Sequence, residues 1–380
     1  MAQTLRTDWT LFLTIVFMVC LGLVAVYSAS SMVATLKFEK PSYYFLLRQG
    51  GWAVVGFAAL LLFKRLDYRR LAQARYVFGA MGVVLFLLLL VYFVDSRSHR
   101  WFRLGGVSLQ PSELAKPALA LFLAWFVSRR LAVVNNRYTL IPAGLAVVLM
   151  GAVVVISDLG TAVVLVATAV SVFFVAGIRR QYLAIALAAG LLGGFVAVMW
   201  KPYRLVRVLN HFESLDRALY AVDPHGKLRE RIVGSVAHRD PTYQLRQSKI
   251  AIGSGGVFGL GPMQGKQKLL YLPEAHTDFI YAVVGEETGL LGCVVLLTGF
   301  LIIAWKGFQL FWLAPDDFGR YLALAITVSI VFQAFMNLSV VLGLAPTKGI
   351  PLPMISNGGS SLVATLTQLG MLLSVSERAV

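Results

Sequence analysis

Residues 272–305 read LPEAHTDFIYAVVGEETGLLGCVVLLTGFLIIAW, so that a short polar segment runs directly into a long apolar stretch. The apolar part is long enough to form a helix across the roughly 30 Å hydrocarbon core of a bilayer. Ionisable side chains are expensive to place at membrane depth, so a functional role is their default interpretation. The segment therefore predicts a membrane helix that carries a chemical group, Asp278, at its outer end.

Apolar stretches of this kind recur along the whole chain. Of its 380 residues, 58% are hydrophobic and 14% are charged. We therefore predict an all-α polytopic membrane protein with a single integral membrane domain over residues 1–380. The first apolar run is too long for the core of a signal peptide and is interpreted as the first span. About ten spans are predicted, with a large extracytoplasmic loop at about 201–277 between spans 7 and 8: 9–31, 48–63, 76–94, 111–128, 139–156, 159–178, 181–200, 278–305, 319–343 and 353–375.

Lysine and arginine gather in the short loops after the even-numbered spans 2, 4 and 6. Cytoplasmic loops collect these residues, so the pattern predicts a multi-pass protein of the cytoplasmic (inner) membrane with both termini in the cytoplasm. The residues concerned are Lys64, Arg65, Arg69, Arg70, Arg75, Arg129, Arg130, Arg137, Arg179 and Arg180.

Positive charge also lies on the opposite face, where membrane insertion does not require it. The loop after span 3 contains Arg100 and Arg103 beside aromatic residues and glycines, and the long loop contains Lys249 among other cations. The planar fork of arginine matches phosphate oxygens, which favours an anion site in the first of these loops. For Arg229–Arg239 a solvated surface is the simpler interpretation. Nucleic acid is not an expected partner, because no nucleic-acid-binding module accompanies the charge.

Further polar groups lie at the ends of spans. Glu113 and Lys116 are three residues apart and share one helix face at the start of span 4. They could form a self-neutralised structural pair, but two charges exceed what packing requires. Asp158 stands between spans 5 and 6, where it could cap a helix, serve the site, or do both.

Two glycine-rich or proline-rich loops complete the outer face. The run from Gly253 to Gly261 fails the register of a phosphate-binding loop and is interpreted as flexible backbone beside a site. The loop at 344–361 contains three prolines and Lys348, and irregular backbone at membrane depth is tolerated where it lines a cavity or is buried in protein. The five histidines lack zinc-type spacing. No serine precedes a lysine by three residues, so the nucleophile motif of penicillin-binding transpeptidases is absent.

These motifs together resemble the SEDS family, the FtsW and RodA cell-wall glycosyltransferases of bacteria. The resemblance covers nearly the whole chain, and the segment Pro346-Thr347-Lys348-Gly349 is more similar to the division branch, FtsW, than to the elongation branch, RodA. Two departures are Asn357, where the family usually has an aromatic residue, and a longer segment at about 213–240. The motifs that carry the resemblance are Gln110–Lys116, Asp158–Thr161, Ala251–Gly261, Leu272–Phe279, Gly285–Glu287, Gly349–Pro353 and Gly358–Ser361.

The resemblance implies a peptidoglycan glycosyltransferase that polymerises lipid II at the outer face of the membrane, in septal wall synthesis during cell division. Asp278 is then expected to be the general base, and a divalent cation (Mg²⁺ or Mn²⁺) that bridges Asp278 and the leaving group is implied as well. No organic cofactor is expected, and Glu286 is expected to support helix packing. The expected substrate-binding residues are Arg100, Arg103, Glu113, Lys116, Asp158, Lys249, His276, Lys348 and Ser360.

Three alternatives stay open at this point: a lipid II flippase or other amphiphile transporter, a RodA-type elongation polymerase, and a scaffold without chemistry. A transporter needs charges near the bilayer midplane, whereas the ionisable groups here gather at the outer ends of spans. A polymerase without a crosslinking motif should work beside a transpeptidase. The resemblance points to a class B penicillin-binding protein and to other divisome proteins as partners.

Overall fold

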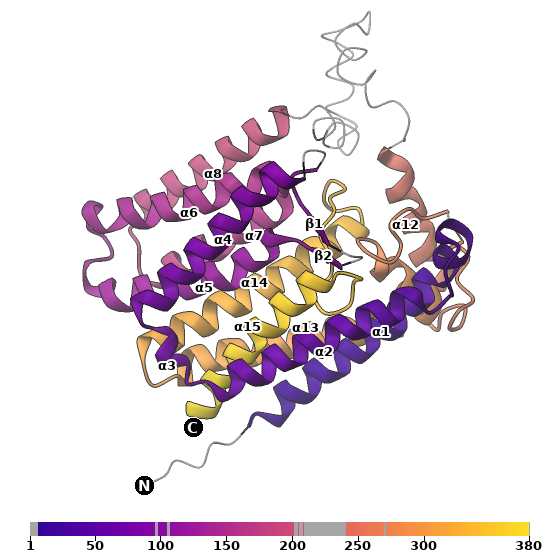
Figure 1. Ribbon diagram of the computed structural model, residues 1–380, viewed down its shortest axis with the longest axis horizontal. Helices are drawn as coiled ribbons and strands as arrows, with labels where there is room; N and C mark the ends of the chain where they lie inside the picture. Colours follow the sequence, from indigo (N-terminus) through magenta and orange to yellow (C-terminus); the bar gives the residue numbers. More distant parts are fainter. Residues whose placement is uncertain are drawn as a thin grey trace, which may run out of the picture.

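The computed structural model describes residues 7–95, 98–104, 107–200, 204, 208, 241–269 and 271–379. Within them the chain is a bundle of long helices with one small hairpin (Figure 1). About half of the predicted loop at 201–277, including the longer segment at about 213–240, lies outside the described residues. The elements are α1 (Trp9–Phe38), α2 (Tyr44–Arg65), α3 (Tyr68–Leu71), α4 (Ala74–Val94), β1 (Phe102–Leu104), β2 (Val107–Leu109), α5 (Pro111–Arg130), η1 (Leu131–Val133), α6 (Arg137–Ser157), α7 (Leu159–Val175), α8 (Arg180–Trp200), α12 (Pro241–Gly255), α13 (Ile280–Leu313), α14 (Asp317–Val341) and α15 (Gly359–Arg378).

Each of the ten predicted spans coincides with one of these helices, which confirms the polytopic all-α architecture. Eight of the helices are long and apolar enough to cross a membrane. Of the other two, α7 has only 17 residues, and α5 carries four charged residues at its two ends, Glu113, Lys116, Arg129 and Arg130. The last helix begins at Gly359 rather than at 353, because Pro351 and Pro353 keep the preceding backbone irregular.

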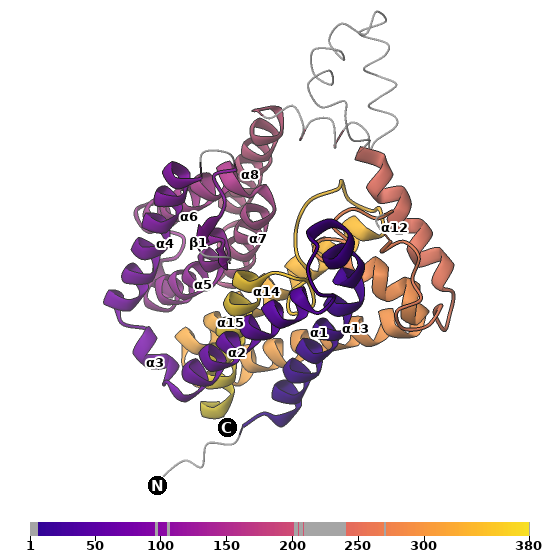
Figure 2. The same ribbon diagram turned by 45° about the vertical axis from the view of Figure 1, so that its right-hand side comes forward.

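Helices α5, α14 and α15 form the centre of the bundle. α4, α6, α7 and α8 lie on one side of them, and α1, α2 and α13 lie on the other (Figure 2). α15 packs against α2 and α5, while α14 packs against α5, α7 and α13. The central helices are the most enclosed: 83% of the most apolar window of α15 is buried and only 6% of that of α8. The buried polar side chains of these helices, such as Lys116, Asn337 and Gln368, therefore face protein rather than lipid.

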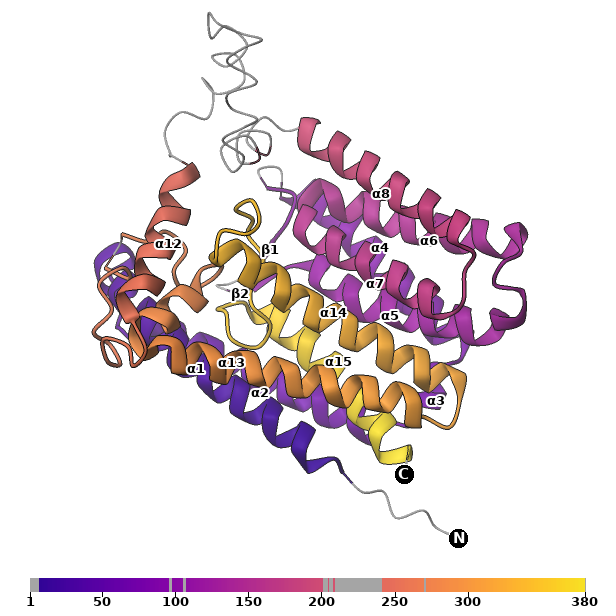
Figure 3. The same cartoon turned by 180° about the vertical axis from the view of Figure 1, so that it is seen from behind.

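Both termini and α3 lie at one end of the bundle, and the β1–β2 hairpin, α12 and the loop before α15 lie at the other (Figures 1 and 3). Ion pairs tie the first end together, including Lys64–Glu377 at 2.9 Å and Lys306–Asp8 at 2.9 Å. The hairpin pairs Phe102 with Leu109 in antiparallel register. The end that carries the hairpin also carries the candidate site.

Helix α13 is broken where the glycine run meets it. Gly289 has φ 64° and ψ −159° inside the helix, a conformation that favours glycine. The freed carbonyls of Glu286 and Glu287 accept the backbone N–H groups of Leu260 and Gly261, each at 3.0 Å. A Cβ added at Gly259 would lie 2.1 Å from the carbonyl oxygen of Glu287. Gly255 and Gly259 therefore allow close backbone contact, whereas a Cβ added at Gly253 or Gly256 would meet nothing within 4 Å; the flexibility of the run stays a prediction.

The two glutamates of the break fasten the same loop through their side chains. Glu286 accepts the backbone N–H groups of Lys266 at 2.7 Å and of Gln267 at 3.2 Å. Glu287 is paired with the buried Lys268 and accepts a hydrogen bond from Ser28 of α1 at 2.6 Å. The expectation that Glu286 supports packing agrees with this geometry, although what it packs is the loop before α13.

Candidate active site

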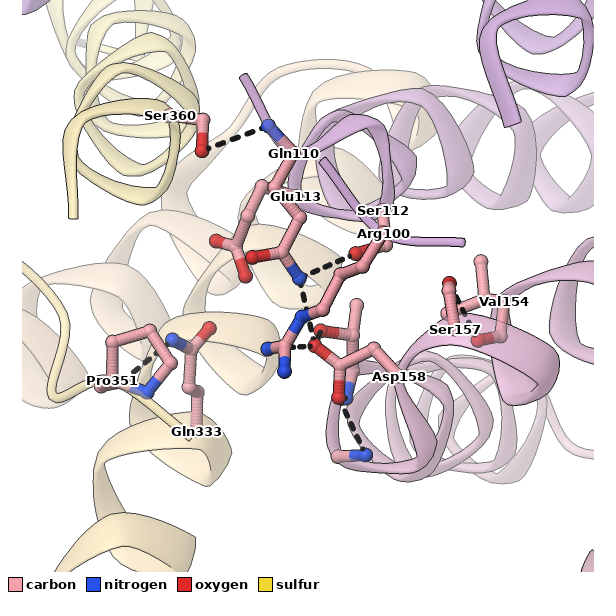
Figure 4. A network of polar contacts seen from close by, with 12 residues as sticks. Arg100, Gln110, Ser112, Glu113, Val154, Ser157, Asp158, Gln333, Pro351 and Ser360 are labelled. Carbon is pink, nitrogen blue, oxygen red and sulfur yellow. Dashed lines mark hydrogen bonds and ion pairs between the residues drawn. The ribbon is translucent and has the colours of Figure 1, made fainter. Parts of the chain in front are cut away.

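Asp158 is the centre of a buried polar network between α6 and α7. Its Oδ1 accepts the N–H groups of Gly160 at 2.9 Å and Thr161 at 3.2 Å, which caps the start of α7. Its Oδ2 accepts hydrogen bonds from Arg100 Nη2 and Gln110 Nε2, each at 2.9 Å (Figure 4). The cap interpretation of Asp158 is confirmed, and the same carboxylate also pairs with Arg100; its role in the site stays a prediction.

Lys348 lies close enough to Asp158 to share its field. Burial and the nearby Arg204 lower the pKa of the Lys348 ammonium to about 8, and Asp158 only partly opposes this. Burial of Asp158 would raise the pKa of its carboxyl, but Arg100, Thr161 and Lys348 outweigh that effect and lower it. One buried carboxylate therefore sits among cations that exceed its charge.

Glu113 and Lys116 form a second polar group on α5. Lys116 Nζ lies 2.7 Å from Glu113 Oε2, and both side chains are 2% exposed. Lys116 also donates to Gln333 of α14, whose amide donates to the carbonyl of Pro351 at 2.8 Å. The shared helix face was correctly predicted. Lys116 pairs with Glu113 and Gln333, and the partner of Asp158 is Arg100.

Asp278 stands two residues before the start of α13 and is half-buried. Its backbone carbonyl accepts a hydrogen bond from Asn337 Nδ2 of α14 at 2.8 Å. Its carboxylate lies against Gly349, where an added Cβ would be 2.8 Å from Oδ2. Because Gly349 follows Lys348 in the chain, a single loop contacts Asp278 and lies in the field of Asp158.

Ile350 connects the region around Asp158 with the region around Asp278. A Cβ added at Gly160 would lie 2.6 Å from Ile350 Cγ1, so Ile350 packs directly on the first turn of α7 behind Asp158. The carbonyl of Ile350 and that of Asp278 share the same donor, Asn337. The structure thus brings Asp158, Lys348 and Asp278 to one region.

The remaining predicted residues lie around this region at different depths. Ser360, at the start of α15, is buried and accepts the backbone N–H of Gln110 at 3.3 Å (Figure 4). Arg103 is exposed on β1. Lys249 is exposed on α12, with its side chain against Gly343 at the end of α14.

His276 packs its ring on Phe45 of α2, with the ring centroids 5.1 Å apart. Burial lowers the pKa of its imidazole, Glu274 opposes the shift, and Lys37 adds to it. Its Nδ1 is buried and has no hydrogen-bond partner among the described residues.

Sequence reasoning missed Gln333 and Asn337 as parts of the site. Both are buried amides on α14, 2% and 1% exposed. Their spacing of four residues places them on one helix face. Amides inside an apolar span are the signal that could have found them, since they must be satisfied within the protein. Arg204 was passed over among the loop cations, although it donates to the carbonyls of Ala197 and Val155 at 3.0 Å.

The comparisons with known proteins show the family and the fold. The chain is 39% identical, over 98% of its own length and 95% of the other's, to a protein of Geobacter metallireducens named probable peptidoglycan glycosyltransferase FtsW. A subunit of a peptidoglycan synthase complex, solved to study the coordination of polymerization and crosslinking, has a similar fold, with a TM-score of 0.72 and 29% identity over 98% of both chains.

The crystal structure of the rod shape determining protein RodA of Thermus thermophilus is also similar, with a TM-score of 0.68 and 28% identity over 98% of both chains. The sequence profile of the FtsW/RodA/SpoVE family, described as cell cycle protein, matches residues 8–379. The chain therefore belongs to the FtsW/RodA/SpoVE family.

Proposed function

We propose that this protein is a peptidoglycan glycosyltransferase that polymerises lipid II at the outer face of the cytoplasmic membrane during cell division. The similarity to proteins named FtsW supports the reaction and the division branch. The observation that carries the proposal is the position of Asp278: its carboxylate lies at Gly349, next to Lys348 and the cations around Asp158. A carboxylate that can accept a proton thus lies beside a group of cations that can bind an anion, at one end of the bundle.

In the proposed reaction, Asp278 removes the proton from the 4-hydroxyl group of the acceptor sugar. The resulting oxygen attacks the anomeric carbon of the donor glycan chain. The bond from that carbon to undecaprenyl pyrophosphate breaks, and the leaving group takes the electron pair, with inversion at carbon. General-base catalysis of this type contributes about 10²–10⁴-fold to the rate.

The leaving pyrophosphate needs cations that are already in place. Arg100 is oriented by its ion pair with Asp158, and its Nε has no hydrogen-bond partner among the described residues. This leaves one N–H of the guanidinium for a phosphate oxygen. Lys348 adds positive charge nearby, while the charge of Lys116 is balanced by Glu113. Arg103 and Lys249 are exposed, where they would attract the anion before it docks.

A divalent cation fits this site only together with substrate. No group of three histidine, cysteine or acidic side chains that could hold a metal ion occurs among the described residues. Mg²⁺ is commonly held by one or two carboxylates and substrate phosphates. Asp278 is the residue that would hold it, and the bound ion would neutralise charge on the leaving group.

The proposal also includes the orientation of the protein in the membrane and its partner protein. The excess of lysine and arginine in the loops after spans 2, 4 and 6 supports placing both termini in the cytoplasm, which puts Asp278 outside. The solved relative that belongs to a polymerising and crosslinking complex supports a class B penicillin-binding protein as partner. We extend this to a place among the divisome proteins.

The test is polymerisation of purified lipid II by the reconstituted protein with its cognate transpeptidase, with glycan chains resolved on a gel. We expect wild type to make chains and Asp278→Asn to lose at least 10²-fold in rate, by the general-base argument. Asp67→Asn, at the opposite end of the bundle, is the matched control. Equal rates for Asp278→Asn and wild type would contradict the proposed base. If no variant makes chains and wild type moves labelled lipid II across vesicles, the transporter alternative replaces the polymerase.

A further inference from the structure

Three consecutive backbone carbonyls before α13 are each held by a donor from α14 or from the loop that follows it. The carbonyl of His276 accepts the N–H of Asn357 at 3.0 Å, and that of Thr277 accepts the hydroxyl of Ser356. The carbonyl of Asp278 accepts Asn337 Nδ2 at 2.8 Å. Hydrogen bonds to the backbone therefore fix residues 276–278, whatever contacts the side chain of Asp278 makes.

Asn337 differs from the other two donors because it joins two segments. Its Nδ2 donates both to the carbonyl of Asp278 and, at 2.7 Å, to the carbonyl of Ile350. Both hydrogens of one nitrogen are thus used, so the two carbonyls must converge on a single point. A reversed carboxamide would turn its oxygen toward both carbonyl oxygens, so the orientation of the side chain is determined by its surroundings.

The oxygen of this carboxamide indicates that packing alone does not explain an asparagine at position 337. Asn337 is 1% exposed, and its Oδ1 has no hydrogen-bond partner among the described residues. A buried acceptor without a partner is unfavourable, and an apolar side chain of the same size would avoid that loss. Holding two carbonyls together is what the amide does and a leucine could not do.

The convergence has a direct consequence for Asp278. Ile350 follows Gly349, so fixing the Ile350 carbonyl beside the Asp278 carbonyl also fixes Gly349 beside the Asp278 carboxylate. The loop itself is anchored from the other side by Gln49 of α2, which donates to the carbonyl of Ser356 at 3.1 Å and accepts the N–H of Gly358 at 3.2 Å. The carboxylate thus has a defined place relative to Lys348.

We propose that Asn337 is a positioning residue that sets the place of Asp278 by clamping the Asp278 and Ile350 carbonyls together. The proposal rests on the proposed function, because it assumes that Asp278 is the base. Asn337 holds the base through the backbone carbonyl of Asp278. A misplacement of about 1 Å in a reacting group can cost roughly 10²-fold in rate.

The experiment compares Asn337→Leu with Gln368→Met in the reconstituted complex. Gln368 is a matched control, since it is also a buried amide, 1% exposed, but it lies on α15 and its Nε2 donates to Ser329 Oγ at 3.4 Å. We would measure the initial rate of polymerisation, the affinity for fluorescently labelled lipid II, which needs no turnover, and the melting temperature.

For Asn337→Leu we expect a rate loss of about 10- to 100-fold, with an affinity within about twofold of wild type and a melting temperature close to that of Gln368→Met. An unchanged rate, or a loss of affinity by the same factor as the rate, would overturn the positioning role. If Asn337→Leu does not fold, Gly349→Ala tests the same geometry, because its methyl group would lie 2.8 Å from Asp278 Oδ2. That variant should lose rate at unchanged affinity, and normal rate in it would contradict the inference.

Asp278→Asn is measured in parallel to separate the two proposals. If Asp278→Asn is inactive while Asn337→Leu turns over normally, the positioning role fails and the base stands. If Asp278→Asn is as active as wild type, the base itself is wrong, whatever the result at Asn337.

Discussion

Asp158 and Asp278 are two carboxylates at the same end of the bundle, and the protein holds them in opposite ways. The carboxylate of Asp158 is only 6% exposed and is surrounded by the donors of Arg100, Gln110 and Thr161. Asp278 is half-buried, is held through its backbone carbonyl, and its carboxylate lies at a glycine. Asp158 is enclosed as a fixed counter-charge for its cations, whereas Asp278 is placed through its backbone and is only half-buried.

The largest expected effect is on the free energy of unfolding, when either of these two residues is replaced by alanine. Asp158→Ala removes a helix cap and leaves Arg100 and Lys348 without their counter-charge, so we expect it to lower the free energy of unfolding by about 3–5 kcal/mol. Asp278→Ala should lower it by less than Asp158→Ala does, because Asp278 is only half-buried and the hydrogen bond to its backbone carbonyl remains. Equal losses of stability in the two variants would remove the distinction between them.

How much of this contrast the sequence could predict depends on the kind of contact involved. The helices follow from apolar run length, and Glu113 with Lys116 follows from helix spacing, because both are local properties of the chain. The pairing of Arg100 with Asp158 joins residues 58 positions apart, and no periodicity encodes it. The bridge from Asn337 to Asp278 uses a backbone carbonyl, which every residue has, so no side-chain pattern could indicate it.

The glycine run shows the same limit in a different form. Glycine predicts that something special happens to the backbone, but flexibility and close packing have the same composition. The outcome is decided by a distant partner, where Gly289 breaks α13 and the backbone N–H of Leu290 donates to the carbonyl of Gly256 at 2.9 Å.

An intermediate effect is expected from the pH dependence of Lys348, the cation that faces Asp158 and Arg204. With its pKa lowered to about 8, the ammonium is charged below that pH and neutral above it. We expect kcat/KM for lipid II, which reports the free enzyme, to fall by up to about tenfold per pH unit above the pKa. Lys348→Arg should remove this alkaline limb, because guanidinium stays charged.

Titration of Lys348 cannot cause that loss of rate at high pH by unfolding the protein. Because the pKa of Lys348 is lower in the folded protein than its ordinary 10.5, the folded state binds fewer protons between about pH 8 and 10.5, and stability rises with pH there. A rate loss at high pH that Lys348→Arg retains would assign the limb to another group.

The smallest effect is expected at the opposite end of the bundle, where charges of the same kind face solvent. On α14, Arg320 Nη1 lies 3.3 Å from Oδ1 of Asp317, which precedes it by one turn. The two side chains are 44% and 43% exposed. Helix pairs three or four residues apart contribute about 0.2–0.5 kcal/mol, so Arg320→Met should shift the free energy of unfolding by less than about 1 kcal/mol and leave polymerisation unchanged. Arg100→Met removes the same type of partner from the enclosed Asp158 and should cost several times more stability. If the two variants unfold alike, the enclosure of Asp158 by the bundle does not strengthen its ion pair, and the counter-charge role assigned to it loses its physical basis.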